Sequence, residues 1–183
     1  MITASDMSGK VLLVTGAGGG IGQATAIALA EAGASVSIID VKAEGLAETA
    51  GQIEALGGVA HIQALDLSLA ENCHSAVGAA VDRFGRLDAL CNVAGVLKLA
   101  HSHEMPVADW NLVLAVNLSA PFFLCQAAIP HLLKTDGAIV NVSSLAAHIG
   151  EAYSAAYCAS KGGLSQLTKA LAMEYMHQSI RIN

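Results

Sequence analysis

The sequence predicts an α/β fold, a doubly wound parallel sheet with helices on both faces. Two observations lead to this prediction. Apolar segments of strand length alternate with helical segments along the chain, and a glycine cluster separates the first strand from the first helix. Strands that alternate with helices pair in parallel, because each right-handed crossover returns the chain to the same end of the sheet. We expect a single domain over residues 1–183.

The first unit of the fold runs from Lys10 to Asp40. Residues 10–15 are a β-branched and leucine run that predicts a buried strand, and residues 23–32 have the Ala, Ile and Leu density of a helix. Gly33 is a plausible helix stop, and residues 35–39 form a second strand that leads into Asp40. The unit is therefore a strand, a glycine turn, a helix and a strand.

The glycine turn between this strand and helix indicates an anion site. Free N–H groups and the positive end of the helix dipole face the ligand, and the absence of Cβ atoms lets a pyrophosphate approach. Asp40 follows Gly22 by 18 residues, close to the spacing at which an acid accepts hydrogen bonds from a ribose diol. The spelling is T-G-x-x-x-G-x-G on Thr15, Gly16, Gly20 and Gly22. An ordinary tight turn is the alternative, but the flanking strands and Asp40 favour dinucleotide binding.

The later segments continue the alternation. We expect a helix at residues 43–56, one that runs up to residue 84, and two long ones at 109–133 and 154–176. Between them we expect strands at residues 59–65, 87–93 and 137–142, and a sixth strand begins at 180–183. Pro121 interrupts the helical pattern at 109–133 and Pro130 lies near its end, so a kink or a break is expected there. Asp66 either caps the helix that follows it or contacts an adenine edge.

Charge and hydropathy exclude several classes of function. The 183 residues are 54% hydrophobic and only 4% aromatic, so Ala, Val, Leu and Ile must build the core. The net charge of −6 opposes nucleic-acid binding by phosphate neutralisation. Met1 to Gly9 lacks the apolar run of a signal peptide, and no segment has 18 uninterrupted apolar residues, so we expect no membrane segment. A soluble cytoplasmic protein follows.

Cysteine and histidine spacing predicts no metal site. His101 and His103 share a loop, but no third ligand lies nearby in sequence, so solvated loop histidines are favoured. The four cysteines have no close spacing and are expected to be small buried hydrophobes in a reducing compartment; they are Cys73, Cys91, Cys125 and Cys158.

A second group of residues has the chemistry of proton transfer. Tyr157 and Lys161 are four residues apart, so on a helix they project from one face. A phenol has an ordinary pKa near 10, but a neighbouring ammonium and a cationic nicotinamide favour the phenolate. Such a phenolate can accept the proton of an alcohol as hydride leaves. Ser144 follows a predicted strand and could hold the substrate oxygen. The alternative is that the Tyr and Lys pair lies on the surface of a helix and has no catalytic role.

Together these motifs resemble the short-chain dehydrogenase/reductase family, of the typical type. The resemblance extends over essentially the whole chain and rests on five motifs in the family's order: Thr15–Gly22, Asn92–Gly95, Asn117, Ser144 and Tyr157–Lys161. It implies a Rossmann-like fold and an oxidoreductase that uses a nicotinamide dinucleotide.

The resemblance also implies roles for single residues. Ser144, Tyr157 and Lys161 match the catalytic triad, and Asn117 matches the asparagine that holds a water between the lysine and solvent. The implied cofactor-binding residues are Gly16, Gly19, Gly20, Ile21, Gly22, Asp40, Asp66, Leu67, Asn92, Ala94, Gly95, Tyr157 and Lys161. Asp40 favours NAD over NADP, because a 2′-phosphate would meet its negative charge and the nearest cation is Lys42.

Two departures from the family pattern stand out. Val93 replaces the usual second asparagine, so only main-chain contacts are expected there. Family members usually run to roughly 250 residues, within the range of one α/β domain. We therefore expect this chain, which ends in the sixth strand, to be a cut or fragmentary form that lacks the usual C-terminal strand and substrate lid.

The leading hypothesis is an NAD-dependent oxidoreductase that interconverts a small secondary alcohol and its ketone. An NADPH-dependent 3-oxoacyl reductase and an inactive dinucleotide-binding sensor or assembly protein are the alternatives. A homotetramer or dimer is expected from the resemblance. Small residues of the 154–176 helix permit close packing with a second copy, although packing on its own sheet explains them equally.

Overall fold

The structure is a computed structural model that describes residues 6–183. Residues 1–5 of the Met1 to Gly9 segment, in which no signal peptide is expected, lie outside the described residues. Six strands form one sheet in the order β3-β2-β1-β4-β5-β6, and every neighbouring pair is parallel. The strands are β1 (Val11–Thr15), β2 (Ser35–Asp40), β3 (Val59–Ala64), β4 (Ala89–Asn92), β5 (Ala138–Asn141) and β6 (Arg181–Ile182). The predicted parallel α/β fold is confirmed.

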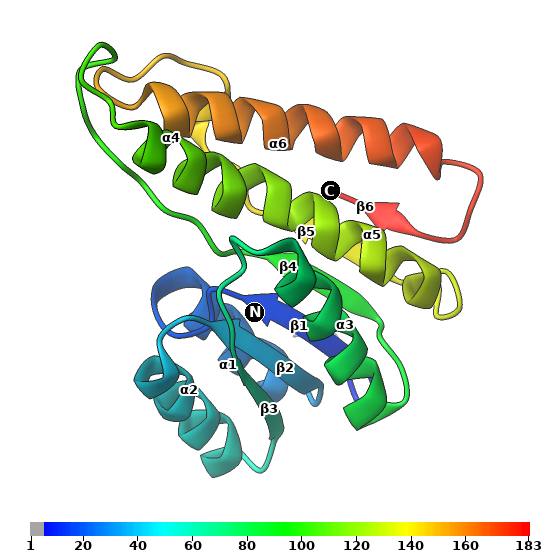
Figure 1. The fold of residues 1–183 in the computed structure, drawn as a ribbon. Helices are drawn as coiled ribbons and strands as arrows, with labels where there is room; N and C mark the ends of the chain where they lie inside the picture. The colour runs from blue at the N-terminus through cyan, green and yellow to red at the C-terminus, as the bar shows by residue number, and fades with distance from the viewer. Residues whose placement is uncertain (1–5) are drawn as a thin grey trace, which may run out of the picture.

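Helices cover both faces of this sheet (Figure 1). The helices α1 (Gly20–Glu31) and α2 (Ala43–Ala55) pack on one face. The other face carries α3 (Ala70–Phe84), α5 (Ala120–Leu132) and α6 (Ala155–Glu174). The helix α4 (Val107–Leu114) precedes α5 in the same helical segment and packs against α6. In Figure 1, α6 lies alongside the helix that α4 and α5 form together.

Alternate residues of each strand enter opposite layers of the core. Val11 and Leu13 of β1 belong to the cluster beneath α3 and α5, whereas Leu12 and Val14 belong to the cluster beneath α1 and α2. This is the period-2 pattern of a strand that is buried on both sides. The strand β1 therefore appears in the sequence as a nearly continuous apolar run.

The expected break in the long helix is a change of helix type. Val107–Leu132 is one continuous helical segment, and its middle, Ala115–Ser119 (η1), is a π-helix. Pro121 lies in the first turn of α5, directly after this π turn, and Pro130 lies inside α5. A proline lacks the N–H that an α-helix needs, and a wider turn before it accommodates the loss. The π turn also contains Asn117.

The same helix has the length and composition of a membrane span. The sequence analysis expected no such segment, because polar residues interrupt its apolar run. It is the one such segment within residues 6–183, and 44% of its most apolar window is buried inside the fold. Apolar helices in the core of soluble proteins have the same properties, so the segment is weak evidence for a membrane.

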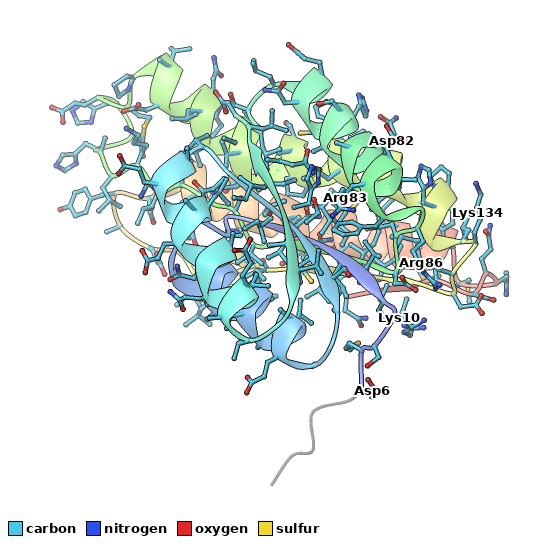
Figure 2. The ribbon with its side chains drawn as sticks, turned by 90° about the horizontal axis from the view of Figure 1, so that it is seen from below. Asp6, Lys10, Asp82, Arg83, Arg86 and Lys134 are labelled. Atoms are coloured by element: carbon cyan, nitrogen blue, oxygen red, sulfur yellow. The ribbon has the colours of Figure 1, made fainter. Side chains whose placement is uncertain are left out.

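Asp88 joins β1 to β4 at the amino ends of the strands. Its carboxylate accepts hydrogen bonds from the N–H of Val11 at 2.9 Å, from Arg86 at 2.7 and 2.8 Å, and from Lys10 at 3.1 Å. Figure 2 shows Lys10 and Arg86 on the same side of the molecule. Burial raises the pKa of Asp88, but the hydrogen bonds from Arg86, Val11 and Lys10 outweigh it, so the pKa lies below its ordinary value of 3.8.

Three of the four cysteines are buried as expected. Burial raises the pKa of Cys73 and Cys91 to about 11 and that of Cys125 to about 12. Cys158 is only half-buried, which corrects the prediction for this residue, because it lies between the half-buried Tyr157 and the exposed Ala159 at the start of α6.

Candidate active site

The glycine turn follows β1 and opens α1, as predicted. Gly16 has φ +68° and Gly20 has φ +53°, a backbone region that side chains disfavour. A Cβ on Gly16 would lie 2.9 Å from the Ala94 Cα, and one on Gly22 would collide with the carbonyl oxygen of Gly16. A Cβ on Gly19 or Gly20 would project into open space. The first pair of glycines therefore packs the turn, and the second pair leaves room for a ligand.

A cavity of about 570 Å³ lies over this turn. Of the predicted cofactor-binding residues, those that line it are Gly16, Gly19, Ile21, Gly22, Asp40, Asp66, Leu67, Ala94 and Gly95. The lining residues that the sequence prediction did not identify are Val41, Lys42, Leu65, Val96, Leu112 and Val116, and Val93 also lines the cavity. An apolar cavity with an acid at one rim and free helix N–H groups at its floor fits a dinucleotide.

The two acids at this cavity make hydrogen bonds with nearby backbone groups. The Asp40 carboxylate accepts from the N–H of Gly18 and from that of Lys42, both at 3.0 Å. Asp66 accepts from the N–H of Ser68 at 2.9 Å. It does not cap a helix, which corrects one of its two predicted roles, because α3 begins after Leu69 with no side-chain cap.

Thr15 joins the glycine turn to the end of β4. Its hydroxyl oxygen accepts hydrogen bonds from the N–H groups of Val93 and Ala94, both at 3.0 Å. Val93 thus contributes its main chain, as expected. The close approach of Gly16 to Ala94 also places the end of β4 beside the glycine turn.

Asn92, a predicted cofactor-binding residue, does not line the cavity. Its amide nitrogen donates to the side-chain oxygen of Asn141 at 2.8 Å and contacts the Cys125 sulfur at 3.7 Å. Asn141 in turn donates to the Thr168 hydroxyl at 2.9 Å. The Asn92 side chain therefore ties β4 to β5 and α6.

Lys161, Asn117 and Gly95 meet at one end of the site. Lys161 is 3% exposed as a residue, and its ammonium donates to the carbonyl oxygen of Val142 at 2.7 Å. Burial lowers its pKa. A Cβ on Gly95 would lie 3.5 Å from the Asn117 side-chain oxygen and 3.6 Å from the Lys161 nitrogen. The Lys161 nitrogen is 5.8 Å from the centroid of the Tyr157 ring, so the predicted pair is adjacent.

Asn117 is fully buried and clamps the loop after β4. Its side-chain oxygen accepts from the N–H of Val96 at 2.8 Å, and its amide nitrogen donates to the Val96 carbonyl at 2.9 Å and to the Ser160 hydroxyl at 3.1 Å. The π turn brings this asparagine from the middle of a long helix to the loop that carries Gly95.

Two serines follow β5 and have different partners. Ser144 begins a short 3₁₀ helix, Leu145–Ala147 (η2), and its oxygen accepts from the N–H of Ala146 at 3.2 Å. Ser143 bonds to the Lys161 carbonyl at 3.1 Å and to the Ser165 hydroxyl at 2.7 Å. Ser143, Ser160 and the Val142 carbonyl were missed by the sequence prediction, since small residues after a strand carry no distinctive pattern.

His101 and His103 lie in the loop after β4, with ring centroids 5.6 Å apart. Within residues 6–183 no group of three or more His, Cys, Asp or Glu residues could hold a metal ion. The His101 ring instead contacts the exposed Tyr153 ring edge-on, with the centroids 4.8 Å apart.

A family model described as short chain dehydrogenase matches residues 10–183. The chain belongs to the short-chain dehydrogenase family. D-threitol dehydrogenase from Mycolicibacterium smegmatis is 42% identical over 178 residues, which are 97% of this chain and 68% of that protein. Two solved structures also match closely. NAD⁺-bound xylitol dehydrogenase has a TM-score of 0.93 at 34% identity over 98% of this chain and 70% of its own.

The second structure is a metagenomic short-chain oxidoreductase in complex with NADP. It has a TM-score of 0.94 at 38% identity and covers 98% of this chain and 82% of its own. This short-chain dehydrogenase is thus an oxidoreductase that acts on CH–OH groups. Its cofactor is a nicotinamide dinucleotide, for which the cavity over the glycine turn has the required size and groups.

Proposed function

We propose that this short-chain dehydrogenase uses NAD to interconvert a secondary alcohol and its ketone, with Tyr157 as the general acid and base. One observation supports this most directly. The buried Lys161 ammonium, held by the Val142 carbonyl, lies against the Tyr157 ring next to Gly95 at the end of the cofactor cavity. A fixed cation beside a phenol favours the phenolate, which is the form that accepts a proton.

A bound nicotinamide dinucleotide supplies the hydride acceptor. The residues of the chain move the proton and hold the substrate. Tyr157 accepts the alcohol proton at its phenolic oxygen, and Ser144 donates a hydrogen bond to the substrate oxygen. Lys161 stabilises the negative phenolate, and Asn117 fixes the loop that faces the Lys161 nitrogen. In the reverse direction Tyr157 returns the proton to the ketone.

The preference for NAD follows from Asp40. Its carboxylate lines the cavity at the end of β2, where the adenosine ribose of a dinucleotide is expected. A carboxylate accepts hydrogen bonds from a ribose diol and repels a 2′-phosphate. Lys42 also lines the cavity, and its main chain donates to Asp40. Asp66 and Leu67 would contact the adenine from the end of β3.

The test compares both cofactors with a panel of substrates at equal concentrations. NAD reduction by secondary alcohols, faster than NADP reduction, is the expected result. Faster NADPH oxidation with a 3-oxoacyl thioester would replace this proposal with a 3-oxoacyl reductase. Tight binding of either dinucleotide without turnover of any alcohol or ketone would instead indicate a binding protein.

We also propose that the protein forms a homodimer or homotetramer through α6 and the α4–α5 helix. Gly163 of α6 packs within the chain, since a Cβ there would lie 2.9 Å from Leu118. Ala155 and Ala159 of α6 are exposed, so these small residues are available to a second copy. Sedimentation of the purified protein tests this, and a monomer would exclude it.

A further inference from the structure

Thr49 is a fully buried polar residue on the apolar face of α2. Its hydroxyl oxygen lies 2.7 Å from the carbonyl oxygen of Ala17 and 2.9 Å from that of Gly45, and it accepts a hydrogen bond from the Gln23 amide at 3.0 Å. The bond to Gly45, four residues earlier, is the usual partner of a threonine inside a helix. The bond to Ala17 is different, because it reaches the glycine turn.

The Ala17 carbonyl and the Gly18 N–H belong to one peptide group, and both ends of that group are held. Thr49 donates to the carbonyl, and the Asp40 carboxylate accepts from the N–H at 3.0 Å. The backbone of α2 also packs closely against the carbonyl group of Gly18, because a Cβ on Gly45 would collide with the Gly18 oxygen. The Ala17–Gly18 peptide plane is therefore clamped from β2 on one side and from α2 on the other.

This clamp bears on the groups that face the cavity. Glycine permits many backbone conformations, so a turn of three successive glycines needs outside contacts to hold one of them. Gly19, Ile21 and Gly22 follow the clamped plane directly and line the cavity. A fixed plane before them sets the direction of the N–H groups at the start of α1, where a pyrophosphate would bind.

We propose that Thr49 is a positioning residue for the cofactor, acting through the Ala17–Gly18 peptide plane. The proposal rests on the dinucleotide site described above. Thr49 touches no ligand itself, because it lies beneath the turn and outside the cavity lining. Its effect should thus appear in the affinity for the dinucleotide and not in the rate of the chemical step.

The experiment measures NADH binding by fluorescence titration for the wild type and three variants. Thr49→Val keeps the shape of the side chain and removes the hydroxyl, and Thr49→Ser keeps the hydroxyl. Thr135→Val is the matched control, because the Thr135 hydroxyl also lies within hydrogen-bond distance of two carbonyl oxygens, those of Leu87 at 2.7 Å and Leu132 at 3.2 Å. It lies at the opposite ends of the strands, near the start of β5.

Thr49→Val is expected to raise the Kd for NADH about 3- to 10-fold, the loss of roughly one hydrogen bond. The KM for the cofactor should rise with it, while kcat at saturating cofactor stays within about twofold of the wild type. Thr49→Ser should have the Kd of the wild type. Thr135→Val should also leave the Kd unchanged, although it should lose about as much thermal stability as Thr49→Val.

An unchanged Kd in Thr49→Val, or an equal rise in Thr135→Val, would overturn the proposal, since either result reduces Thr49 to a stabilising residue. If Thr49→Val does not fold, Thr49→Ala is used in its place, because it removes the same hydroxyl without adding volume. Failure of the wild type to bind NADH or NADPH would overturn the proposed function together with this inference, so the two failures are distinguishable.

Discussion

The Lys161 nitrogen lies 5.8 Å from the centroid of the Tyr157 ring and 2.7 Å from the Val142 carbonyl oxygen. The lysine is 3% exposed, and burial lowers the pKa of its ammonium. A cation within about 6 Å of an aromatic ring is attracted to it. The carbonyl of Val142 therefore fixes the position of the Lys161 nitrogen beside the Tyr157 ring.

We predict that Tyr157→Phe abolishes alcohol-dependent NAD reduction and leaves the NADH affinity within about threefold of the wild type. The phenolic oxygen is the proton acceptor, and a positioned acid or base contributes typically 100- to 10,000-fold to a rate. Steady-state kinetics and fluorescence titration measure the two quantities. Tyr153→Phe is the control, because Tyr153 is exposed and lies four residues before the site. Its activity should stay near that of the wild type, and undiminished turnover in Tyr157→Phe would exclude the proposed role.

Asp40 should influence both the choice of cofactor and the glycine turn. Asp40→Asn removes the charge and keeps an acceptor for the Gly18 N–H, so the ratio of the NADPH Kd to the NADH Kd should fall roughly tenfold, as one lost charge contact of about 1.4 kcal/mol implies. Asp40→Ala removes both the charge and the acceptor, so either dinucleotide should bind more weakly than it binds to Asp40→Asn. Titration with NADH and NADPH measures the two affinities. A preference that stays the same in both variants would contradict the assignment of Asp40.

Asn117 should be needed for stability as well as for activity. Asn117→Ala leaves the N–H and the carbonyl of Val96 without their partner, which should lower the free energy of unfolding by about 2 kcal/mol. Chemical denaturation measures this. Asn111→Ala, an exposed position on α4 in the same helical segment, should change the free energy by less than about 0.5 kcal/mol. Equal effects of the two substitutions would show that the clamp on Val96 contributes nothing.

Asp88 should give a pH-dependent contribution to stability. Its pKa in the folded chain lies below the ordinary value of 3.8, so the unfolded chain binds the proton more readily. The stabilisation is therefore fully present above about pH 5 and is lost as the pH falls through the lower, folded pKa. Asp88→Asn should cost about 2 kcal/mol of unfolding free energy at pH 7 and progressively less below pH 4.

Denaturant unfolding of the wild type and Asp88→Asn from pH 3 to pH 7 measures this dependence. Asp82→Asn, an exposed residue on α3 that Figure 2 labels, is the control and should stay within about 0.5 kcal/mol of the wild type at pH 7. A cost of Asp88→Asn that is the same at every pH would contradict the charged role of Asp88.

Much of the fold follows from local patterns. The strand and helix segments were predicted within a few residues, because the apolar runs and the glycine stops act on neighbouring residues. The glycine turn, Asp40, Tyr157 and Lys161 were recognisable for the same reason, since their spacing is local. The π turn was not predicted, because Pro121 signals only that the helix must change and not how.

The sequence by itself determined the alternation of strands and helices, the glycine turn between β1 and α1, and the pairing of Tyr157 with Lys161 on one helix. Only the tertiary structure decided which distant groups hold them. The Val142 carbonyl fixes Lys161, and Thr49 fixes the peptide group after Ala17, a residue 32 positions earlier. A backbone carbonyl has no identity in a sequence, and a buried hydroxyl finds its partner only when two elements pack. The local hydrophobic pattern therefore determines the helices and strands, and the close packing between them determines the geometry of the site.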